Sequence, residues 1–211
     1  KYSYLYETII NQSLASVKEY REAGMHSIDT AVLQILAYNS LNDKKTFFKE
    51  SEIRNVLRQI AEEMMLDEIN FNNFIERMSK SKMILKDTFS SETYKFCYPY
   101  IFYYFSAKYM VNHLDDKDVN TLMEYMSCNL HNETYGNVIT FICYLNNSST
   151  IIDDILLNSY DTLKDFSEFD YSKNSPIFDA MKNAVCAYLP KHVPENDDVE
   201  HNKDLELKII K

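Results

Sequence analysis

Residues 94–110 place bulky apolar side chains around one short segment, and this run constrains the fold more than any other part of the chain. It reads YKFCYPYIFYYFSAKYM. Tyr94, Phe96 and Tyr98 alternate as in a short strand, and Pro99 suits the first turn of a helix because its missing N–H has no helical partner there. The sequence therefore predicts a strand that leads directly into a helix. That helix carries aromatic side chains on every face, so it must be buried or partnered.

The composition indicates a mostly helical globular protein. The 211 residues are 45% hydrophobic, with only 2 Gly and 4 Pro, which is too apolar for a disordered chain and too poor in turn formers for an all-β fold. The net charge of -10 repels the phosphates of nucleic acids and of anionic lipids. The longest apolar run, residues 99–111, is shorter than the ~20 residues that cross a bilayer. We therefore expect no nucleic-acid partner, no membrane partner and a cytoplasmic location.

Hydrophobic periodicity predicts the order of the elements. Helices are expected over residues 2–21, 28–41, 51–65, 70–79, 99–110, 119–130, 132–145, 150–160 and 177–187. Between the fourth and fifth helices the period changes to two, which predicts a hairpin with strands at 83–87 and 92–96. The helices at 28–41, 51–65 and 70–79 are thus followed by a two-stranded ribbon. Three helices and then a ribbon is the element order of a winged helix.

We therefore predict a mainly α fold, in which a winged-helix unit with one small β-hairpin precedes a bundle of antiparallel helix pairs. The winged-helix unit is placed at residues 28–98 and the helical domain at residues 99–165. Residues 166–211 are expected to form a C-terminal helix and an acidic, flexible tail. The chain starts at Lys1 rather than Met and enters a helical pattern at once, so we expect a piece of a longer protein.

The sequence lacks the patterns of an active site. With only Gly24 and Gly136, it cannot form a glycine-rich phosphate-binding loop. The histidines have no metal-binding spacing and are expected at the surface or at helix ends, although His113 beside Asp115 and Asp116 is an alternative cation site. The cysteines have no C-x-x-C pair and are expected to be reduced core thiols: Cys97, Cys128, Cys143 and Cys186. We expect no catalytic residues, no metal site and no cofactor in this chain.

The aromatic run resembles a motif of the bacterial STAND-type NTPases, which are NACHT-like signalling ATPases. Members of that family commonly carry the pattern Phe-x-His-x-x-Phe-x-Glu-Tyr-Phe-x-Ala where the winged helix ends. The matching residues here are Phe96, Tyr104, Phe105 and Ala107. Tyr98 stands at the histidine position, Ile101 at the first aromatic position after it and Tyr103 at the glutamate position. A nucleotide-sensing histidine is therefore not carried over to this chain.

A second block extends the resemblance. Residues 135–145, followed by the apolar positions of 151–156, look like the helix pair that follows in these proteins. The resemblance thus spans about residues 1–165. It implies that residues 1–27 are a helix from a preceding ATPase lid region, and that a P-loop domain binding ATP or ADP with Mg lies upstream. An effector domain is implied further upstream.

The resemblance implies that this chain is the non-catalytic regulatory and oligomerisation segment of a signal-transducing ATPase. A role in antiphage defence, where the family is common, is part of the same expectation. In that class the winged helix folds against the nucleotide site and swings away on activation, so the implied partners are the chain's own ATPase domain and further copies. Candidates for the switching interface are Tyr98, Tyr100, Tyr103 and Tyr104, because tyrosine combines a large apolar body with a polar tip. Tyr98 is the nucleotide-proximal candidate. The alternative is that all four are core residues with satisfied hydroxyl groups.

Two other functions fit the same pattern. A free-standing winged-helix regulator would use residues 71–82 as a DNA-recognition helix, with Arg77, Lys80 and Lys82 as its basic end. A helical adaptor without any ATPase relationship is the other alternative.

Overall fold

The structure is a computed structural model that describes residues 2–17, 25–87, 92–146 and 148–164, together with residues 179, 180 and 183. The chain divides into two units, residues 1–165 and residues 166–211. In the second unit the three described residues are helical and exposed. The predicted acidic tail and most of the predicted helix at 177–187 lie outside the described residues.

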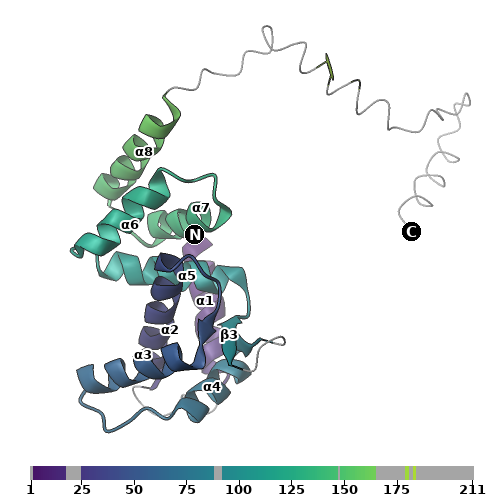
Figure 1. The fold of residues 1–211 in the computed structure, drawn as a ribbon, viewed down its shortest axis with the longest axis vertical. Coiled ribbons are helices and arrows are strands. Elements are labelled where there is room, and N and C mark those ends of the chain that lie inside the picture. The colour runs from purple at the N-terminus through teal and green to yellow at the C-terminus, as the bar shows by residue number, and fades with distance from the viewer. Residues whose placement is uncertain are drawn as a thin grey trace, which may run out of the picture. The chain divides into compact units, whose positions relative to one another are not determined.

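The first unit is mainly helical, as predicted, with one small antiparallel sheet (Figure 1). Its elements in chain order are α1 (Tyr2–Ala15), α2 (Met25–Asn42), β1 (Phe48–Lys49), α3 (Glu50–Glu63), α4 (Phe71–Lys80), β2 (Ile84–Lys86), β3 (Thr93–Phe96), α5 (Pro99–Asn112), α6 (Lys117–Ser127), α7 (Glu133–Leu145) and α8 (Ser149–Leu163). Within the described residues no helix is both long and apolar enough to span a membrane.

The sheet contains the predicted hairpin and one strand that the sequence did not predict. Its strand order is β1-β3-β2, and β2 pairs with β3 so that Ile84 lies opposite Phe96. On the other edge of β3, Phe48 of β1 lies opposite Tyr94. The prediction of a two-stranded ribbon is therefore corrected to three strands. A two-residue strand is too short to show a period in the sequence, and β1 forms because burial of Phe48 fixes it against β3.

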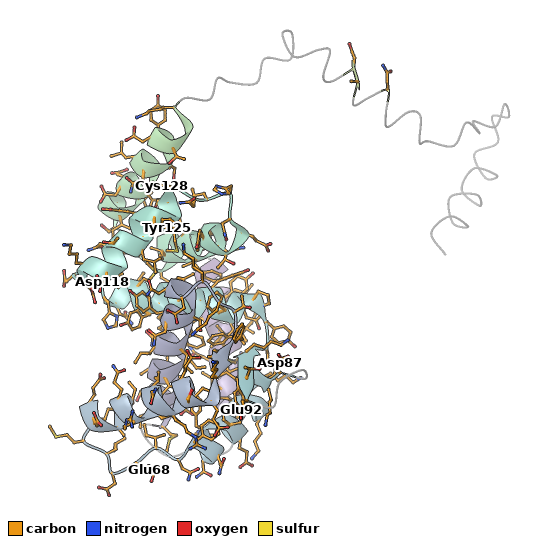
Figure 2. The ribbon with its side chains drawn as sticks, in the orientation of Figure 1. Glu68, Asp87, Glu92, Asp118, Tyr125 and Cys128 are labelled. Atoms are coloured by element: carbon orange, nitrogen blue, oxygen red, sulfur yellow. The ribbon has the colours of Figure 1, made fainter. Side chains whose placement is uncertain are left out.

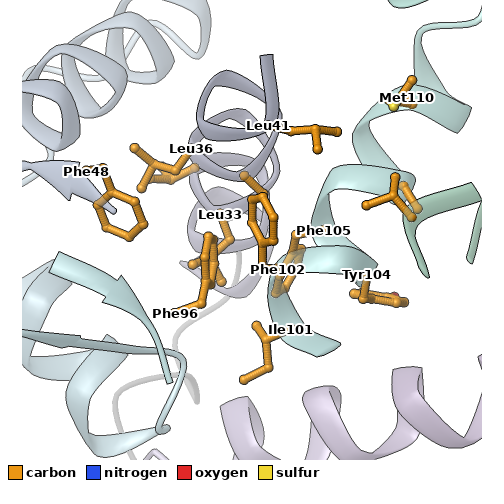
Figure 3. Close-up of a cluster of buried hydrophobic side chains, with 14 of the residues drawn as sticks. Leu33, Leu36, Leu41, Phe48, Phe96, Ile101, Phe102, Tyr104, Phe105 and Met110 are labelled. Carbon is orange, nitrogen blue, oxygen red and sulfur yellow. The ribbon is translucent and has the colours of Figure 1, made fainter. Parts of the chain in front are cut away.

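Helix α5 lies in the centre of the core, which confirms that the aromatic segment is covered. It contacts α2 and α7 along its length and β3 at its start. The buried residues of α5 are Ile101, Phe102, Tyr104, Phe105, Ser106, Ala107 and Met110. Figure 3 shows Leu33 and Leu36 of α2 across from the rings of α5. One continuous hydrophobic core joins the elements from α1 to α8.

Side-chain caps explain several of the helix starts. The side chains of Asn70, Asp116 and Asn132 accept hydrogen bonds from backbone N–H groups at the first turns of α4, α6 and α7. Helix α1 ends at Ala15, earlier than the predicted residue 21, and Gly24, the expected helix stop, lies outside the described residues.

Three helices end with a left-handed residue that is not glycine. In α3, the Met65 N–H donates to the Glu62 carbonyl (3.2 Å) and the Leu66 N–H donates to the Ala61 carbonyl (2.8 Å), the double hydrogen bond of a Schellman motif. Helices α2 and α4 end in the same way. The left-handed residues are Lys44 (φ 55), Met65 (φ 54) and Lys82 (φ 56). Glycine is usual at this position, and a side chain there adds about 1 kcal/mol of strain or more.

A buried ion pair joins α2 to α4. The Arg77 Nε and Nη2 atoms donate to the two carboxylate oxygens of Asp29 at 2.7 and 2.8 Å, and both side chains are buried. This two-pronged contact compensates each charge for the loss of water, so removal of either partner leaves an uncompensated buried charge. The pair therefore fixes the orientation of α4 on α2.

We predict opposite effects for two glycine substitutions at the end of α4. Lys82→Gly relieves a left-handed side chain and should raise the free energy of unfolding by about 1 kcal/mol. Lys80→Gly falls inside the right-handed helix and should lower it by about 1 kcal/mol. Urea unfolding of both variants and of the wild type measures the two changes. If both substitutions changed the free energy of unfolding in the same direction, the strain assigned to Lys82 would be contradicted.

Candidate functional site

The predicted switch tyrosines lie where the chain passes from β3 into α5. Tyr98 is the N-cap residue of α5, with extended backbone angles (φ -135, ψ 142), and Pro99 occupies the first turn. This confirms the predicted handover from strand to helix. Because Pro99 fixes φ and disfavours a helical conformation in the preceding residue, it holds Tyr98 outside the helix. The Tyr98 side chain is 47% exposed.

Two of the four tyrosines belong to one cluster of rings, which we call the aromatic group: Tyr6, Tyr98, Tyr100 and Phe141. The Tyr98 ring stacks on Tyr100, with centroids 5.7 Å apart and planes inclined by 14°. Tyr100 in turn lies 5.4 Å from Tyr6 of α1, and Tyr6 meets Phe141 of α7 edge to face at 5.1 Å. The aromatic group thus runs from the exposed N-cap of α5 to the contact between α1 and α7.

Tyr104 takes part in a polar cluster between α1 and α5, which we call the polar triangle: Glu7, Tyr104 and Lys108. The Tyr104 hydroxyl donates to Glu7 Oε1 at 3.1 Å and accepts from Lys108 Nζ at 3.0 Å. Lys108 also donates to Glu7 Oε1 at 3.1 Å. The Tyr104 ring lies edge to face with Phe141, so the polar triangle and the aromatic group adjoin each other.

Burial and hydrogen bonding shift the pKa values in this region. Burial raises the pKa of Tyr104 and of Tyr100, so both phenols stay protonated at neutral pH. Burial lowers the pKa of Lys108, but its contacts with Tyr104 and Glu7 outweigh that effect and the net pKa is raised. Lys108 therefore remains charged and compensates Glu7.

The four tyrosine candidates occupy different environments. Tyr98 is exposed and Tyr100 half-buried, whereas Tyr104 is buried with a satisfied hydroxyl group, as the core alternative predicted for it. Tyr103 is half-buried and has its ring 5.9 Å from Phe102, outside the aromatic group. The exposed aromatic face of this region is thus centred on Tyr98 and on the half-buried Tyr100 that stacks on it. Such a face can stack on a flat or apolar surface and can form hydrogen bonds through two phenol groups.

Three residues of this region are not among those predicted from the sequence: Tyr6, Glu7 and Lys108. Lys108 carried a signal, since it is the one cation in the apolar run from 99 to 111 and lies one helical turn after Tyr104. Glu7 and Tyr6 carried none, because their partners are more than 90 residues away in the chain.

The structure revises the predictions for cysteine. Cys97 and Cys143 are half-buried free thiols, and burial raises the pKa of each. Cys128 is exposed at the end of α6, so its prediction as a core thiol is wrong. Cys128 directly follows the amphipathic helix α6. Its apolar neighbours in the sequence suggested burial, because they gave no sign that the helix ends before it. Cys186 lies outside the described residues.

The described histidines do not form a metal site. His113 is the C-cap residue of α5, where its ring stacks on Tyr109 at a centroid distance of 4.0 Å. In the described residues, His113 and its neighbours Asp115 and Asp116 do not make up a group of three metal ligands, and no other such group is found there.

The basic end proposed for DNA recognition is only partly available. Arg77 is buried in its ion pair with Asp29 and faces the core. Lys80 pairs with Glu76 one turn earlier in α4, at 2.8 Å, and Lys82 is exposed. One of the three predicted DNA-contacting cations is therefore committed to the core.

No family model matches the chain, and no significant match is found among curated proteins or solved structures.

We predict that the contribution of the polar triangle depends on pH. The raised pKa of Lys108 means that its charge stabilises the fold fully below the unfolded value of about 10.4, and that this stabilisation is lost as the pH rises through the folded value. Lys108→Met should therefore lower the free energy of unfolding by about 1 kcal/mol at about pH 8, with a smaller deficit at about pH 11.

Urea unfolding at the two pH values measures this deficit. Lys117→Met, which alters an exposed lysine of α6, is the matched control and should change stability little at either pH. A deficit for Lys108→Met that stays constant with pH would contradict the charge-dependent role of Lys108.

Proposed function

We propose that this chain is the non-catalytic regulatory segment of a STAND-type, NACHT-like signalling ATPase, and that it acts as a conformational switch on a nucleotide site in a preceding domain. In this proposal residues 28–98 form a winged-helix unit and residues 99–165 a helical domain. ATP or ADP and Mg²⁺ bind to the preceding domain, and activation brings copies of the protein together. A cytoplasmic location and a role in antiphage defence are part of the same proposal.

The observation that carries this proposal is the passage of the hairpin, through Pro99, into a buried aromatic helix with an exposed tyrosine at its start. The order α2, β1, α3, α4, β2, β3, with β3 in the middle of the sheet, supports the winged-helix interpretation. The burial of the residues that match the family motif is also consistent with this proposal. Phe96, Tyr104, Phe105 and Ala107 are all buried, as framework residues should be, whereas Tyr98, at the histidine position, is exposed.

The contact between α1 and α5 gives the switch its physical basis. Helix α1 would lead from the ATPase lid, and it is tied to α5 by the polar triangle and by the ring of Tyr6. A switch requires contacts that differ in free energy between two states. Movement of α1 would break the hydrogen bonds of Glu7 to Tyr104 and Lys108 and uncover the aromatic group, so these contacts favour the closed arrangement.

The coding sequence in frame before Lys1 provides the first test. We expect it to encode a strand, a G-x-x-x-x-G-K-[ST] loop and a helix. In the resulting ATPase, Tyr98→Ala should raise the rate of ADP release about fivefold or more, because it removes a contact that holds the inactive state. Release of a fluorescent ADP analogue measures this rate.

Tyr160→Ala is the matched control, because Tyr160 is an exposed tyrosine on α8, away from the aromatic group. It should leave ADP release unchanged. A start codon immediately before Lys1 with no NTPase gene beside it removes the proposal. Equal effects of the two tyrosine substitutions would remove the role of Tyr98.

The DNA-binding alternative makes a different prediction. The element order also suits a DNA-binding winged helix, but burial of Arg77 and the net charge of -10 disfavour it. We expect no binding of the 211-residue chain to duplex DNA at about 100 mM salt, measured by fluorescence anisotropy. Binding that weakens with salt and that Lys82→Ala reduces would favour the DNA-binding regulator instead.

A further inference from the structure

A second surface, remote in sequence from the aromatic group, lies at the end of α3. We call it the methionine patch: Met64, Met65 and Leu66. All three side chains are exposed, and Met65 is 95% exposed. The residues on both sides, 62–63 and 67–68, are exposed too. Figure 2 labels Glu68 in this loop, at the edge of the ribbon. Three consecutive large apolar side chains in water are unfavourable unless a partner covers them.

The backbone of the methionine patch is strained as well as exposed. Met65 occupies the left-handed position of the Schellman motif that ends α3, where glycine fits best. Lys44 and Lys82 occupy the corresponding positions of α2 and α4, and their charged side chains suit water. Met65 combines this backbone strain with an apolar side chain that, at 95% exposure, makes almost no contact within the described residues. A residue that is unfavourable in two ways in the isolated chain indicates a role outside it.

A groove of about 410 Å³ adjoins the methionine patch. Its apolar lining comes from α3, from the loop that follows it and from the first residue of α4: Leu57, Ala61, Leu66, Ile69 and Phe71. The unbranched, flexible side chain of methionine fits irregular grooves with an apolar floor and charged sides, and this groove is lined by five apolar and five charged residues. The same surface therefore presents both a projecting apolar side chain and a groove that can receive one.

The charges along this surface change sign. Arg54 and Arg58 line the groove toward the beginning of α3, and Glu62, Asp67 and Glu68 line it toward the end. Arg54, Arg58 and Glu62 are four residues apart, so they share one face of the helix. When two such helices lie antiparallel, the basic part of each faces the acidic part of the other. A parallel arrangement would oppose like charges.

We propose that the methionine patch and its groove bind a second copy of this chain about a two-fold axis, with each Met65 side chain inserted into the groove of its partner. A two-fold interface uses the same surface on both chains and must be complementary to itself. This surface is complementary to itself in shape, because it has both the projecting Met65 and the groove. It is also complementary to itself in charge, because it has both Arg58 and Glu62. The proposal concerns different residues from the aromatic group and stands whether or not an ATPase domain precedes the chain.

Sedimentation equilibrium of the 211-residue chain tests the proposal. The expected result is a concentration-dependent equilibrium between a 24.9 kDa monomer and its dimer. Met65→Gly removes the inserted side chain and suits the left-handed backbone, so this variant should fold and dimerise about tenfold more weakly or worse. Lys82→Gly makes the same backbone change at the end of α4 and should dimerise like the wild type.

Charge reversal tests the two-fold geometry. Arg58→Glu places like charges opposite each other twice in a dimer, and so does Glu62→Arg, so each variant alone should be monomeric. In a mixture of the two variants every such pair is again of opposite charge, and a heterodimer should form. Dimerisation of the wild type, its loss in each single variant and its recovery on mixing together are the pattern expected of an antiparallel, two-fold contact, because a parallel contact would already oppose like charges in the wild type.

Several results would overturn the proposal. One is a wild-type chain that remains monomeric up to about 1 mM, a concentration at which a dimer with a dissociation constant in the millimolar range would already be populated. Another is a dimer that Met65→Gly leaves unchanged, since self-association would then use another surface. A third is the absence of heterodimers in the mixture of charge variants. Circular dichroism melting of each variant shows whether it is folded, so a loss of association cannot be mistaken for unfolding.

Discussion

The fold depends on the burial of a helix that has no polar face. Most amphipathic helices need a neighbour on one side only, but α5 carries apolar side chains all round and must be enclosed. Helix α2 and helix α7 enclose it along its length, and β3 and α1 meet it at its start and flank. Since these neighbours come from both halves of residues 1–165, burial of α5 joins the sheet and the later helices in one core.

Two polar contacts define how elements distant in sequence meet around that core. Asp29 and Arg77 link α2 to α4, and the polar triangle links α1 to α5. Apolar packing tolerates small shifts, whereas a buried charge that loses its partner is strongly destabilised, so such contacts select one arrangement of helices. The two differ in burial. The Asp29–Arg77 pair is enclosed, but Glu7 and Lys108 are partly exposed, which makes the α1 contact the easier of the two to open.

The sequence predicted local structure well and long-range contacts poorly. Helix α5 was predicted closely because Pro99 marks its start, and the hairpin because its period changes to two. The strand β1 escaped prediction because two residues carry no period. The partnership of Glu7 with Tyr104 depends on how α1 lies on α5, which no local pattern encodes. In the candidate site, sequence reasoning found the exposed Tyr98 but could not separate it from the buried Tyr104 in the same aromatic run.

The scarcity of glycine in this chain also bears on the methionine patch. The chain has 2 glycines, and α2, α3 and α4 all end in a motif that favours one. At two of those ends the left-handed residue is an exposed lysine, and the Lys44 ammonium also donates to the Tyr125 hydroxyl at 3.2 Å, so the strain is the main penalty there. At the third, Met65 adds an exposed apolar side chain to the same strain. The end of a helix does not require an exposed apolar side chain, since a lysine can occupy the left-handed position as it does in α2 and α4. The choice of methionine is therefore explained by what the side chain contacts beyond its own chain rather than by the fold.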